Sequence, residues 1–393
     1  MDAREHLRGI GPSDLVAVSL PPGPAWLPLL EELWASGAAV LPLDHRLRPA
    51  EVRSIVDRAR PGLVLDAEGA TVHTDGAGVE AGTGLVLATS GTAGMPKVVE
   101  LAREAVEAAV GASDEALGIG PSEPWLCCLP PAHVGGLLVL MRGVLTGAPV
   151  EVHPGFDLEA VAGADADHVS LVPTMLTRLL EAGADLGRFR TILVGGAALT
   201  DPAAEIARTR GTRVVATYGL TETCGGVVYD GRPVGDAGVR LGLEGELQLA
   251  GPSMMRGYLG DPAATAAAFT LDGWLRTGDA GSIGDDGLVT VAGRLDERIR
   301  TGAETVWPQE VEAALRDHRG VAEVAVAGRR DSEWGEHVVA FVVPASIDEP
   351  PTLEDLRDHA AERIARFKAP RELVLLPELP RTASGKVRRT DLR

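Results

Sequence analysis

The chain has 393 residues and a mass of 40.9 kDa, with 56 acidic and 37 basic side chains and a formal net charge of −19. A hydrophobic fraction of 45% excludes a disordered chain, and the length suffices for two or three compact units with a sizeable core. The acidic balance excludes a general nucleic-acid binder, because contact with phosphate backbones requires a basic face.

In the first two thirds of the chain, short apolar runs alternate with amphipathic stretches. The runs predict buried strands at Leu15–Leu20, Ala39–Pro42, Leu63–Leu65, Thr83–Ala88, Trp125–Leu129, His168–Val172, Thr191–Val194 and Arg213–Ala216. The stretches predict helices such as Ala25–Ser36, Pro49–Arg58 and Thr174–Ala182. Because continuous apolar strands separated by helices are typical of parallel sheets covered by helices, we predict an α/β fold here.

The pattern changes twice in the last third of the chain. Residues 242–291 are glycine-rich with short strand patterns, which predicts a β-rich subdomain. After Arg294 the predicted elements form a small α+β unit: a helix at Pro308–Arg316, strands at Val321–Ala327 and Val338–Val343, a helix at Thr352–Arg363 and a strand at Glu372–Leu376.

The cysteines and the apolar runs predict a soluble cytoplasmic protein. The three cysteines are a poor disulfide framework, since their number is odd and Cys127 and Cys128 are adjacent, so we expect free thiols in a reducing compartment. The N-terminus is charged and lacks a signal peptide, and the longest apolar stretch, 134–145, is too short for a bilayer and contains Arg142.

Only three of the 37 basic residues are lysines, Lys97, Lys368 and Lys386, and the first ends a glycine-rich loop. This loop, Thr89 to Lys97 (TSGTAGMPK), follows a predicted strand. Glycines let backbone N–H groups approach an anion, three hydroxyls add donors and the lysine adds a charge, so the loop is a candidate phosphate site. The alternative is an ordinary strand–helix turn. The Walker pattern is excluded, because proline precedes the lysine and no Ser or Thr follows it.

Two further clusters follow predicted parallel strands, whose carboxyl ends form ligand sites in open α/β sheets. They are Gly195-Gly196-Ala197-Ala198-Leu199 and Tyr218-Gly219-Leu220-Thr221-Glu222-Thr223. The Glu222 carboxylate suits Mg²⁺ that bridges phosphates. The alternative is that Glu222 is an ordinary acid at a helix N-terminus.

Three motifs nearer the C-terminus carry charged residues. DGWLRTGD ends at Asp279, and a carboxylate can accept hydrogen bonds from two vicinal hydroxyl groups. GRLD spans Gly293–Asp296. LPRTASGK ends at Lys386, whose ammonium could offset the repulsion of two anions, although a disordered basic tail is the alternative. Lys368 is interpreted as structural.

Taken in order over residues 89–386, these motifs resemble those of the acyl-adenylate-forming enzymes, a superfamily of acyl-CoA synthetases, peptide adenylation domains and luciferases. TSGTAGMPK resembles [ST]SG[TS][TS]GxPK, with Ala93 in place of a hydroxyl residue. GGAAL resembles GGxPL, with Ala198 in place of proline, and YGLTET resembles YGxTE. DGWLRTGD and GRLD resemble DGWxxTGD and GRxD, and LPRTASGK resembles LPRTxxGK. Residues 299–312 resemble IxxxGExIxPxEVE, with Ala303 and Thr305 as departures.

The resemblance implies a large AMP-binding domain over residues 1–295, a small mobile domain over residues 296–393 and a hinge at Asp296. It implies that Tyr218 stacks on adenine, Thr221 contacts the α-phosphate, Glu222 holds Mg²⁺ and Lys386 acts in adenylation. Asp279 and Arg294 are expected at the ribose, and the loop at Gly302 at the CoA tunnel, where Ala303 adds a methyl group. The remaining implied nucleotide contacts are Thr89, Ser90, Gly91, Thr92, Gly94, Lys97, Gly195, Gly196, Ala197 and Gly219.

Two stretches, Leu129–Leu145 and Glu222–Gly231, are similar to o-succinylbenzoate–CoA ligases of menaquinone biosynthesis, with Ala132 and Gly135 as departures. In that reading His133 shields the acyl pocket and closes on the substrate carboxylate, whereas the alternative is a core or helix-capping histidine. Arg142 interrupts an apolar helix and needs an anionic partner, because a buried unpaired charge is costly. A dicarboxylic substrate, a local glutamate or a carbonyl cluster would each serve.

The predicted function is a two-step ligase that uses ATP, Mg²⁺ and CoA to convert 2-succinylbenzoate into its CoA thioester, AMP and diphosphate. After adenylation, the small domain is expected to rotate about Asp296 and withdraw Lys386. The alternatives are a CoA ligase for another aryl or acyl acid, a stand-alone adenylation enzyme that loads a carrier protein, and a degenerate nucleotide-binding protein. We expect no nucleic-acid or membrane partner. The sequence leaves the oligomeric state open, with a homodimer as one candidate assembly.

Overall fold

The computed structural model describes residue 7 and residues 9–73, 75–89, 96–197, 199, 201–209, 211–381 and 387–392, apart from the side chains of residues 201–203 and 208. By backbone contacts the chain forms two compact units. The first comprises Met1–Val239 and Leu249–Arg276, and the second comprises Arg240–Gln248 and Thr277–Arg393.

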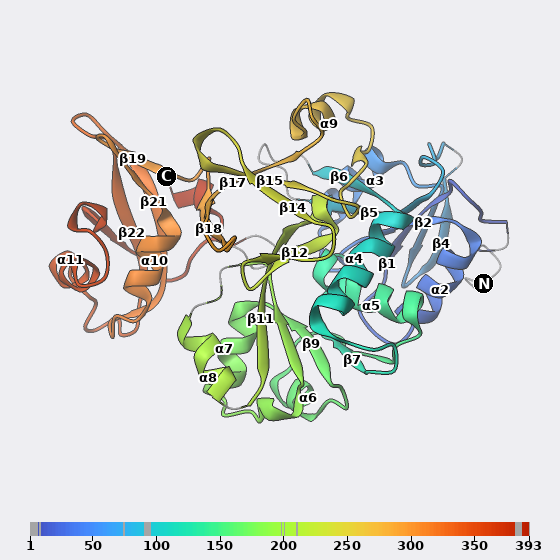
Figure 1. The fold of residues 1–393 in the computed structure, drawn as a ribbon, viewed down its shortest axis with the longest axis horizontal. Coiled ribbons are helices and arrows are strands. Elements are labelled where there is room, and N and C mark those ends of the chain that lie inside the picture. The colour runs from blue at the N-terminus through green and yellow to red at the C-terminus, as the bar shows by residue number, and fades with distance from the viewer. Residues whose placement is uncertain are drawn as a thin grey trace. The chain divides into compact units, whose positions relative to one another are not determined.

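The first unit contains two seven-stranded sheets (Figure 1). In order across the first sheet, the strands are β16 (Gly257–Tyr258), β6 (Lys97–Ala102), β5 (Thr83–Thr89), β2 (Ala39–Pro42), β1 (Leu15–Ser19), β3 (Leu63–Asp66) and β4 (Gly69–Val72). Across the second they are β13 (Arg232–Pro233), β12 (Gly225–Tyr229), β11 (Arg213–Leu220), β10 (Thr191–Val194), β9 (His168–Leu171), β7 (Trp125–Cys127) and β8 (Val150–Val152).

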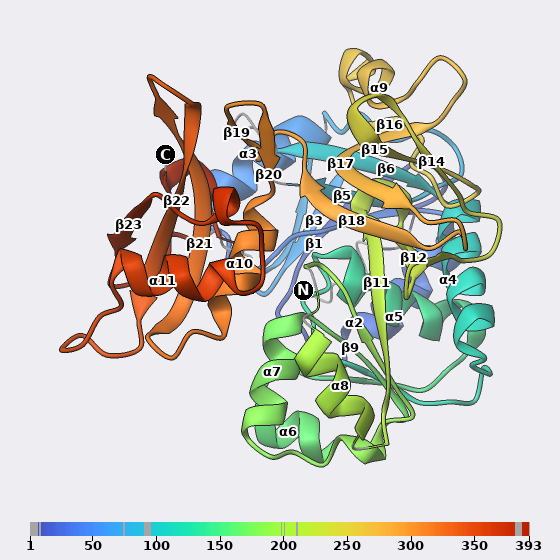
Figure 2. The ribbon, with the colours of Figure 1, turned by 60° about the vertical axis from the view of Figure 1, so that its left-hand side comes forward.

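Helices cover both faces of these sheets, and one layer of helices lies between them. The middle layer consists of α2 (Trp26–Ser36), α4 (Arg103–Leu117) and α5 (Val134–Thr146), of which α4 contacts strands of both sheets. The outer face of the second sheet carries α6 (Leu158–Gly163), α7 (Pro173–Glu181) and α8 (Asp201–Thr209), as Figure 2 shows. Helix α3 (Pro49–Ala59) covers the outer face of the first.

The strands are apolar throughout because they are buried on both faces. Val16 and Val18 of β1 belong to the core between the sheets, whereas Leu15 and Ala17 belong to the core under α3. Cys127, which ends β7, and the next residue, Cys128, likewise face opposite cores. Side chains alternate across a strand, so a continuous apolar run fills two cores at once. The predicted α/β class is confirmed.

The edges of both sheets add antiparallel strands that the strand–helix alternation did not indicate. β4, β6 and β16 join the first sheet antiparallel to their neighbours, and β12 and β13 do the same in the second. The interior strands of each sheet are parallel, as predicted. The glycine-rich loop after β5 therefore leads into the strand β6, not directly into a helix.

The second unit holds most of a four-stranded sheet and all of a five-stranded sheet. The first has the order β14 (Gly238–Leu241), β15 (Glu246–Ala250), β17 (Leu275–Ile283) and β18 (Val289–Arg294). The second has the order β20 (Glu304–Val306), β19 (Ile299–Thr301), β22 (Gly335–Pro344) and β21 (Val321–Asp331), with β23 (Glu372–Leu375) paired to β22. Helices α10 (Pro308–Arg316) and α11 (Leu353–Ala361) pack on one face of the five-stranded sheet.

Short elements complete the fold. They are α9 (Pro262–Ala268) and the 3₁₀ turns η1 (Leu186–Arg188), η2 (Thr221–Thr223), η3 (Leu243–Gly245), η4 (Arg366–Lys368) and η5 (Arg389–Leu392). The β-rich stretch is divided between the two compact units, because the boundaries fall after Val239, Gln248 and Arg276. The predicted hinge at Asp296 stays a prediction. None of the helices in the described part of the chain combines the length and apolar character needed to cross a bilayer.

Candidate functional site

The glycine-rich loop connects two paired strands. Thr89 ends β5, Lys97 begins β6, and the two residues are direct partners in the antiparallel ladder. The Thr89 hydroxyl lies 3.5 Å from the Lys97 carbonyl oxygen. The ladder therefore holds both ends of the loop close together, with Lys97 half-buried. The predicted contacts Ser90, Gly91, Thr92 and Gly94 lie outside the described residues, as does Ala93.

The second predicted cluster lies at the carboxyl ends of two neighbouring parallel strands. β10 ends at Val194, which pairs with Ala216 of β11, so Gly195–Ala197 lies beside Thr217. A Cβ atom on Gly195 would lie 2.6 Å from the Thr217 hydroxyl, so only glycine permits this approach. Ala198 lies outside the described residues. The edge where Gly195, Gly196 and Ala197 meet β11 is where open α/β sheets bind ligands.

The strand β11 continues further than predicted, through Tyr218 and Gly219 to Leu220, because it pairs with β12. At Gly219 the two backbones approach so closely that a Cβ atom would lie 1.9 Å from the Gly225 carbonyl oxygen. Thr221 and Glu222 then form the 3₁₀ turn η2, and Cys224 follows with a left-handed φ of 52°. This tight return places the half-buried Glu222 side chain beyond the end of the sheet.

Two predicted charges, Lys97 and Glu222, are joined by a residue that the sequence motifs did not single out. The Tyr258 hydroxyl donates to Glu222 Oε1 at 2.8 Å. The Lys97 ammonium lies over the ring of the same tyrosine, with Nζ 4.5 Å from the ring centroid. The backbone N–H of Met255 also donates to the Glu222 carbonyl oxygen at 2.8 Å. Lys97, Glu222 and Tyr258 are called the charge cluster below.

His133 lies at the N-cap of α5, with its side chain exposed and without a capping hydrogen bond to that helix. The side chain of the next residue, Val134, lies close to Gly225: its methyl carbon would be 3.7 Å from a Cβ atom built on that glycine. The start of α5 therefore adjoins the turn after Glu222. Burial alone would raise the pKa of the Asp44 carboxyl, but hydrogen bonds from Arg46, with a smaller contribution from His133, hold it below its usual range.

Arg142 is buried and already has partners within the protein. Its Nε lies 2.5 Å from Asp114 Oδ1, and its terminal nitrogen donates to the Ser113 hydroxyl at 2.9 Å. The guanidinium also lies 4.0 Å from the ring centroid of Trp125. The charge of Arg142 is therefore compensated within the protein and does not require a substrate carboxylate. The burial of Arg142 no longer argues for a role in substrate binding, and that role stays a prediction.

The predicted ribose pair lies within the second unit and is in contact. Asp279 of β17 and Arg294 of β18 are ladder partners, with Arg294 Nη1 3.4 Å from Asp279 Oδ1. Arg294 Nε also lies 3.3 Å from Oδ1 of the predicted hinge residue, Asp296. Burial alone would lower the pKa of the Arg294 guanidinium, but the two carboxylates outweigh it and raise that pKa. The sequence motifs TGD and GRLD thus meet in one ion-pair group.

The remaining predicted residues are more dispersed. Gly302 lies exposed at the turn between β19 and β20, with a left-handed φ of 65°, and the described contacts do not connect it to Asp279 or Arg294. Lys386 lies outside the described residues. Lys368 forms an ion pair with Glu310 at 2.5 Å, in keeping with its structural interpretation.

The three cysteines are free and buried, as expected, and burial raises the pKa of each thiol to about 12. Because the thiolate is the reactive form, these side chains act as packing residues. This includes Cys224, although it directly follows the turn that carries Glu222.

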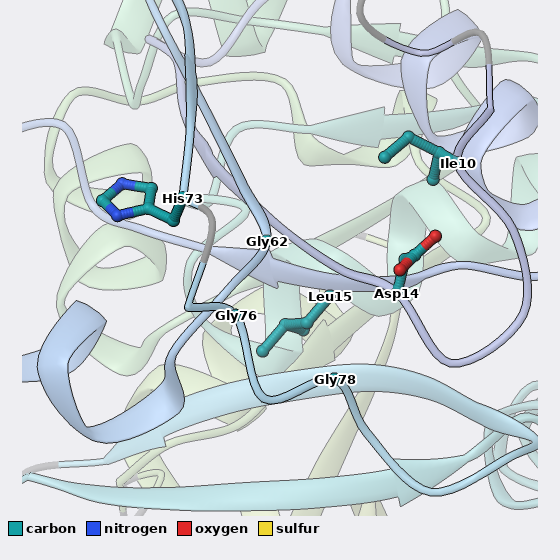
Figure 3. A pocket seen from close by; sticks show the side chains of 7 residues that line it. All are labelled: Ile10, Asp14, Leu15, Gly62, His73, Gly76 and Gly78. Carbon is teal, nitrogen blue, oxygen red and sulfur yellow. The ribbon is translucent and has the colours of Figure 1, made fainter.

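Two other features of the first unit lie away from the predicted residues. One is a pocket of about 260 Å³ whose lining includes His73, Asp14 and Gly62. Figure 3 shows the residues that line it. It adjoins the first residue of β1, the amino end of the parallel strands, whereas the phosphate loop follows the carboxyl end of β5. A second group, Glu123 with His168, is an ion-pair cluster in which Arg190 lies 2.7 Å from the same Glu123 oxygen that the histidine contacts.

Comparison with known proteins defines the class. The family model described as AMP-binding enzyme matches residues 85–259, and the model described as AMP-binding enzyme C-terminal domain matches residues 310–386. Together with the relatives below, these matches show that the chain belongs to the AMP-binding enzyme family. The predicted superfamily is confirmed.

The relatives within this family carry related names. The chain is 40% identical over 322 residues to the probable 2-succinylbenzoate–CoA ligase of Mycobacterium tuberculosis, which covers 78% of this chain and 83% of the relative. It is 32% identical over 423 residues to the 2-succinylbenzoate–CoA ligase of Listeria innocua, with 98% and 90% covered.

Solved structures share the fold. The o-succinylbenzoate CoA synthetase of Bacillus subtilis, in complex with its acyl-adenylate intermediate, has a TM-score of 0.90 at 27% identity, with 100% of this chain and 90% of that chain covered. The same enzyme in complex with ATP and magnesium ion has a TM-score of 0.88 at 27% identity, with 99% and 91% covered.

Proposed function

We propose that this protein is an ATP-dependent acid–CoA ligase that converts 2-succinylbenzoate, ATP and CoA into 2-succinylbenzoyl-CoA, AMP and diphosphate. The observation that carries the proposal is the 40% identity to a relative named as a probable ligase for this acid. The similarity to a structure that holds the corresponding acyl-adenylate extends over the whole chain and supports the same reaction.

In the first proposed half-reaction, a carboxylate oxygen of the acid attacks the α-phosphorus of ATP and diphosphate leaves. In the second, the CoA thiolate attacks the acyl carbon and AMP leaves. No step needs a covalent nucleophile of the protein, so its task is to position anions and to offset their charge. We assign this task to Lys97 and Thr221 at the phosphates and to Asp279 and Arg294 at the ribose. Tyr218 and the backbone of Gly195–Ala197 are proposed at adenine.

The donor set of the charge cluster fits Mg²⁺. Glu222 offers a carboxylate that is partly exposed, accepts from a neutral phenol and forms no ion pair with a described residue. Hard oxygen donors of this type are those that Mg²⁺ prefers. We propose that Glu222 holds the ion, which when bound would screen the charge of the triphosphate.

Lys386 is the proposed cation for the first half-reaction only, with the small domain moving about Asp296 before the second. His133 is proposed to close on the acid, since it adjoins the turn that carries Glu222. The CoA-tunnel role of Gly302 rests on the motif resemblance.

An assay of both half-reactions tests the proposal. Diphosphate release and thioester formation are measured with 2-succinylbenzoate, benzoate and a fatty acid, each with ATP and CoA. We expect diphosphate release and a CoA thioester with 2-succinylbenzoate, and neither product with benzoate or the fatty acid. Turnover with another acid only would identify a different CoA ligase, and adenylate without thioester would identify a carrier-loading enzyme. Absence of acid-dependent diphosphate release with every acid would favour a nucleotide-binding protein without turnover.

We further propose that the protein is a cytoplasmic homodimer. Light scattering of the purified chain tests the dimer, and fractionation of the source cells tests the location. A monomeric mass at micromolar concentration would contradict the first.

A further inference from the structure

Tyr258 has its backbone fixed from two directions. It lies in β16, which pairs with β6 so that Tyr258 is opposite Val99. The N–H of Leu259 donates to the Val98 carbonyl oxygen at 2.7 Å, and Arg256 N–H donates to Glu100 at 2.9 Å. These bonds tie the tyrosine to the strand that begins with Lys97.

The second support comes from α9. The Thr265 hydroxyl accepts from the backbone N–H of Tyr258 at 2.8 Å and donates to the Asp261 carbonyl oxygen at 2.9 Å. Thr265 packs so closely that a Cβ atom on Gly257 would lie 2.6 Å from its methyl carbon. The side chain of Tyr258 is 8% exposed, so both its backbone and its ring are held in place.

From this position the side chain of Tyr258 contacts two opposite charges. The ring face carries the Lys97 ammonium at 4.5 Å, and the hydroxyl donates to Glu222 at 2.8 Å. Within the described residues Lys97 and Glu222 form no ion pair with each other. The carboxylate of Asp261 also interacts electrostatically with Lys97, but it forms an ion pair with Arg58, whose Nη2 lies 2.7 Å from Asp261 Oδ2.

Without the ring, nothing in the charge cluster would separate the two charges. Lys97 begins β6 and Glu222 lies in the turn η2, which contacts that strand. Two opposite charges so placed attract one another, and a direct pair would neutralise both. A phenol offers a negative face to the ammonium and a polar hydroxyl to the carboxylate, so it can engage both while it keeps them apart.

We propose that Tyr258 is a positioning residue that keeps Lys97 and Glu222 from pairing, so that the ammonium stays available to the polyphosphate and the carboxylate to Mg²⁺. The inference rests on the proposed function and adds a residue to it. It assigns Tyr258 to recognition of the metal–triphosphate end of the nucleotide, with no contact to the acid or to CoA.

Equilibrium binding separates this role from a structural one. The dissociation constants of MgATP and of metal-free AMP are measured by calorimetry for the wild type, Tyr258→Phe and Tyr258→Leu. The phenylalanine keeps the ring under Lys97 and removes only the donor to Glu222. Loss of one hydrogen bond corresponds to about 2- to 10-fold weaker MgATP binding. The leucine also removes the ring, so we expect it to weaken MgATP binding further. AMP lacks the β- and γ-phosphates, so its affinity should not change in either variant.

Tyr229→Phe is the matched control. Tyr229 is also buried and also donates one hydrogen bond from its hydroxyl, at 2.9 Å to Ser113. We expect this variant to bind MgATP and AMP as the wild type does.

The outcomes are distinguishable. Equal weakening of MgATP and AMP, or unchanged MgATP binding in both Tyr258 variants, overturns the role of Tyr258 and leaves the proposed function intact. Failure of the wild type to bind MgATP overturns the proposed function and this inference with it. Because the measurement uses no acid, it is independent of which acid the enzyme activates.

Discussion

Replacement of Asp114 by alanine tests whether Arg142 serves the fold or the substrate. The side chain of Arg142 is 4% exposed in the layer of helices between the two large sheets. Among the described residues, Asp114 of α4 is its only carboxylate partner. Removal of one member of a buried pair leaves an uncompensated charge, which costs about 3–5 kcal/mol of unfolding free energy. The Ser113 hydroxyl and the Trp125 ring would remain and would keep the loss within that range.

Replacement of the other partner, Arg142, is expected to cost less unfolding free energy. Arg142→Met retains an unbranched apolar side chain of similar length, and the Asp114 side chain is 18% exposed, so water can reach the carboxylate. Loss of the charged hydrogen bond then costs about 1.5–3 kcal/mol. In Asp114→Ala/Arg142→Met no charge is stranded, so the double variant should lose clearly less than the two single variants together.

Urea unfolding followed by tryptophan fluorescence gives these free energies, since Trp125 lies directly beneath the guanidinium. The KM for 2-succinylbenzoate is measured in parallel for Arg142→Met. If Arg142 is structural, this KM stays close to that of the wild type. Additive losses in the double variant, or a large rise in KM without loss of stability, would refute the structural role and restore the substrate role.

Three further predictions address other parts of the molecule. Lys386→Ala should slow adenylate formation by orders of magnitude and leave thioester formation from supplied acyl-adenylate largely intact; equal loss in both half-reactions would contradict the two-conformation scheme. Gly219→Ala should lower the melting temperature strongly, because the new Cβ would lie 1.9 Å from the Gly225 carbonyl oxygen, whereas Gly111→Ala in α4 meets no atom within 4 Å and should be tolerated. Burial holds the pKa of the His168 imidazole below its ordinary 6.5, so the unfolded chain binds the proton more readily. The free energy of unfolding should therefore fall as the pH drops below 6.5, and a pH series of urea midpoints on His168→Gln should show a weaker dependence.

Local patterns in the sequence were sufficient for the interior strands and for the position of each motif. The apolar run Leu15–Leu20 predicts a strand buried on both faces, and Val16 and Ala17 of the observed β1 do point into different cores. The glycines at 195 and 219 were found as parts of motifs. The structure gives the physical reason for them, since a Cβ atom at either position would lie 2.6 Å or less from a neighbouring oxygen.

Edge strands could not be predicted in the same way. β6 follows the glycine-rich loop directly and pairs with β5, and β11 runs on to Leu220 because it pairs with β12. The alternation of strands and helices indicates parallel crossovers only. The connection from Thr89 to Lys97 is longer than the two-residue turns by which hairpins are recognised in sequences.

The sequence by itself determined the family, the α/β class and the motif residues, because these depend on residue type and on spacing along the chain. The tertiary structure decided which side chains meet. Asp114 became the partner of Arg142 when α4 and α5 packed between the sheets, and Tyr258 reached Lys97 and Glu222 when β16 joined the edge of β6. Neither partner lies in a motif, and both contacts join segments far apart in the sequence. Spacing along the chain carries no information on such contacts, since they form only when the sheets and helices pack.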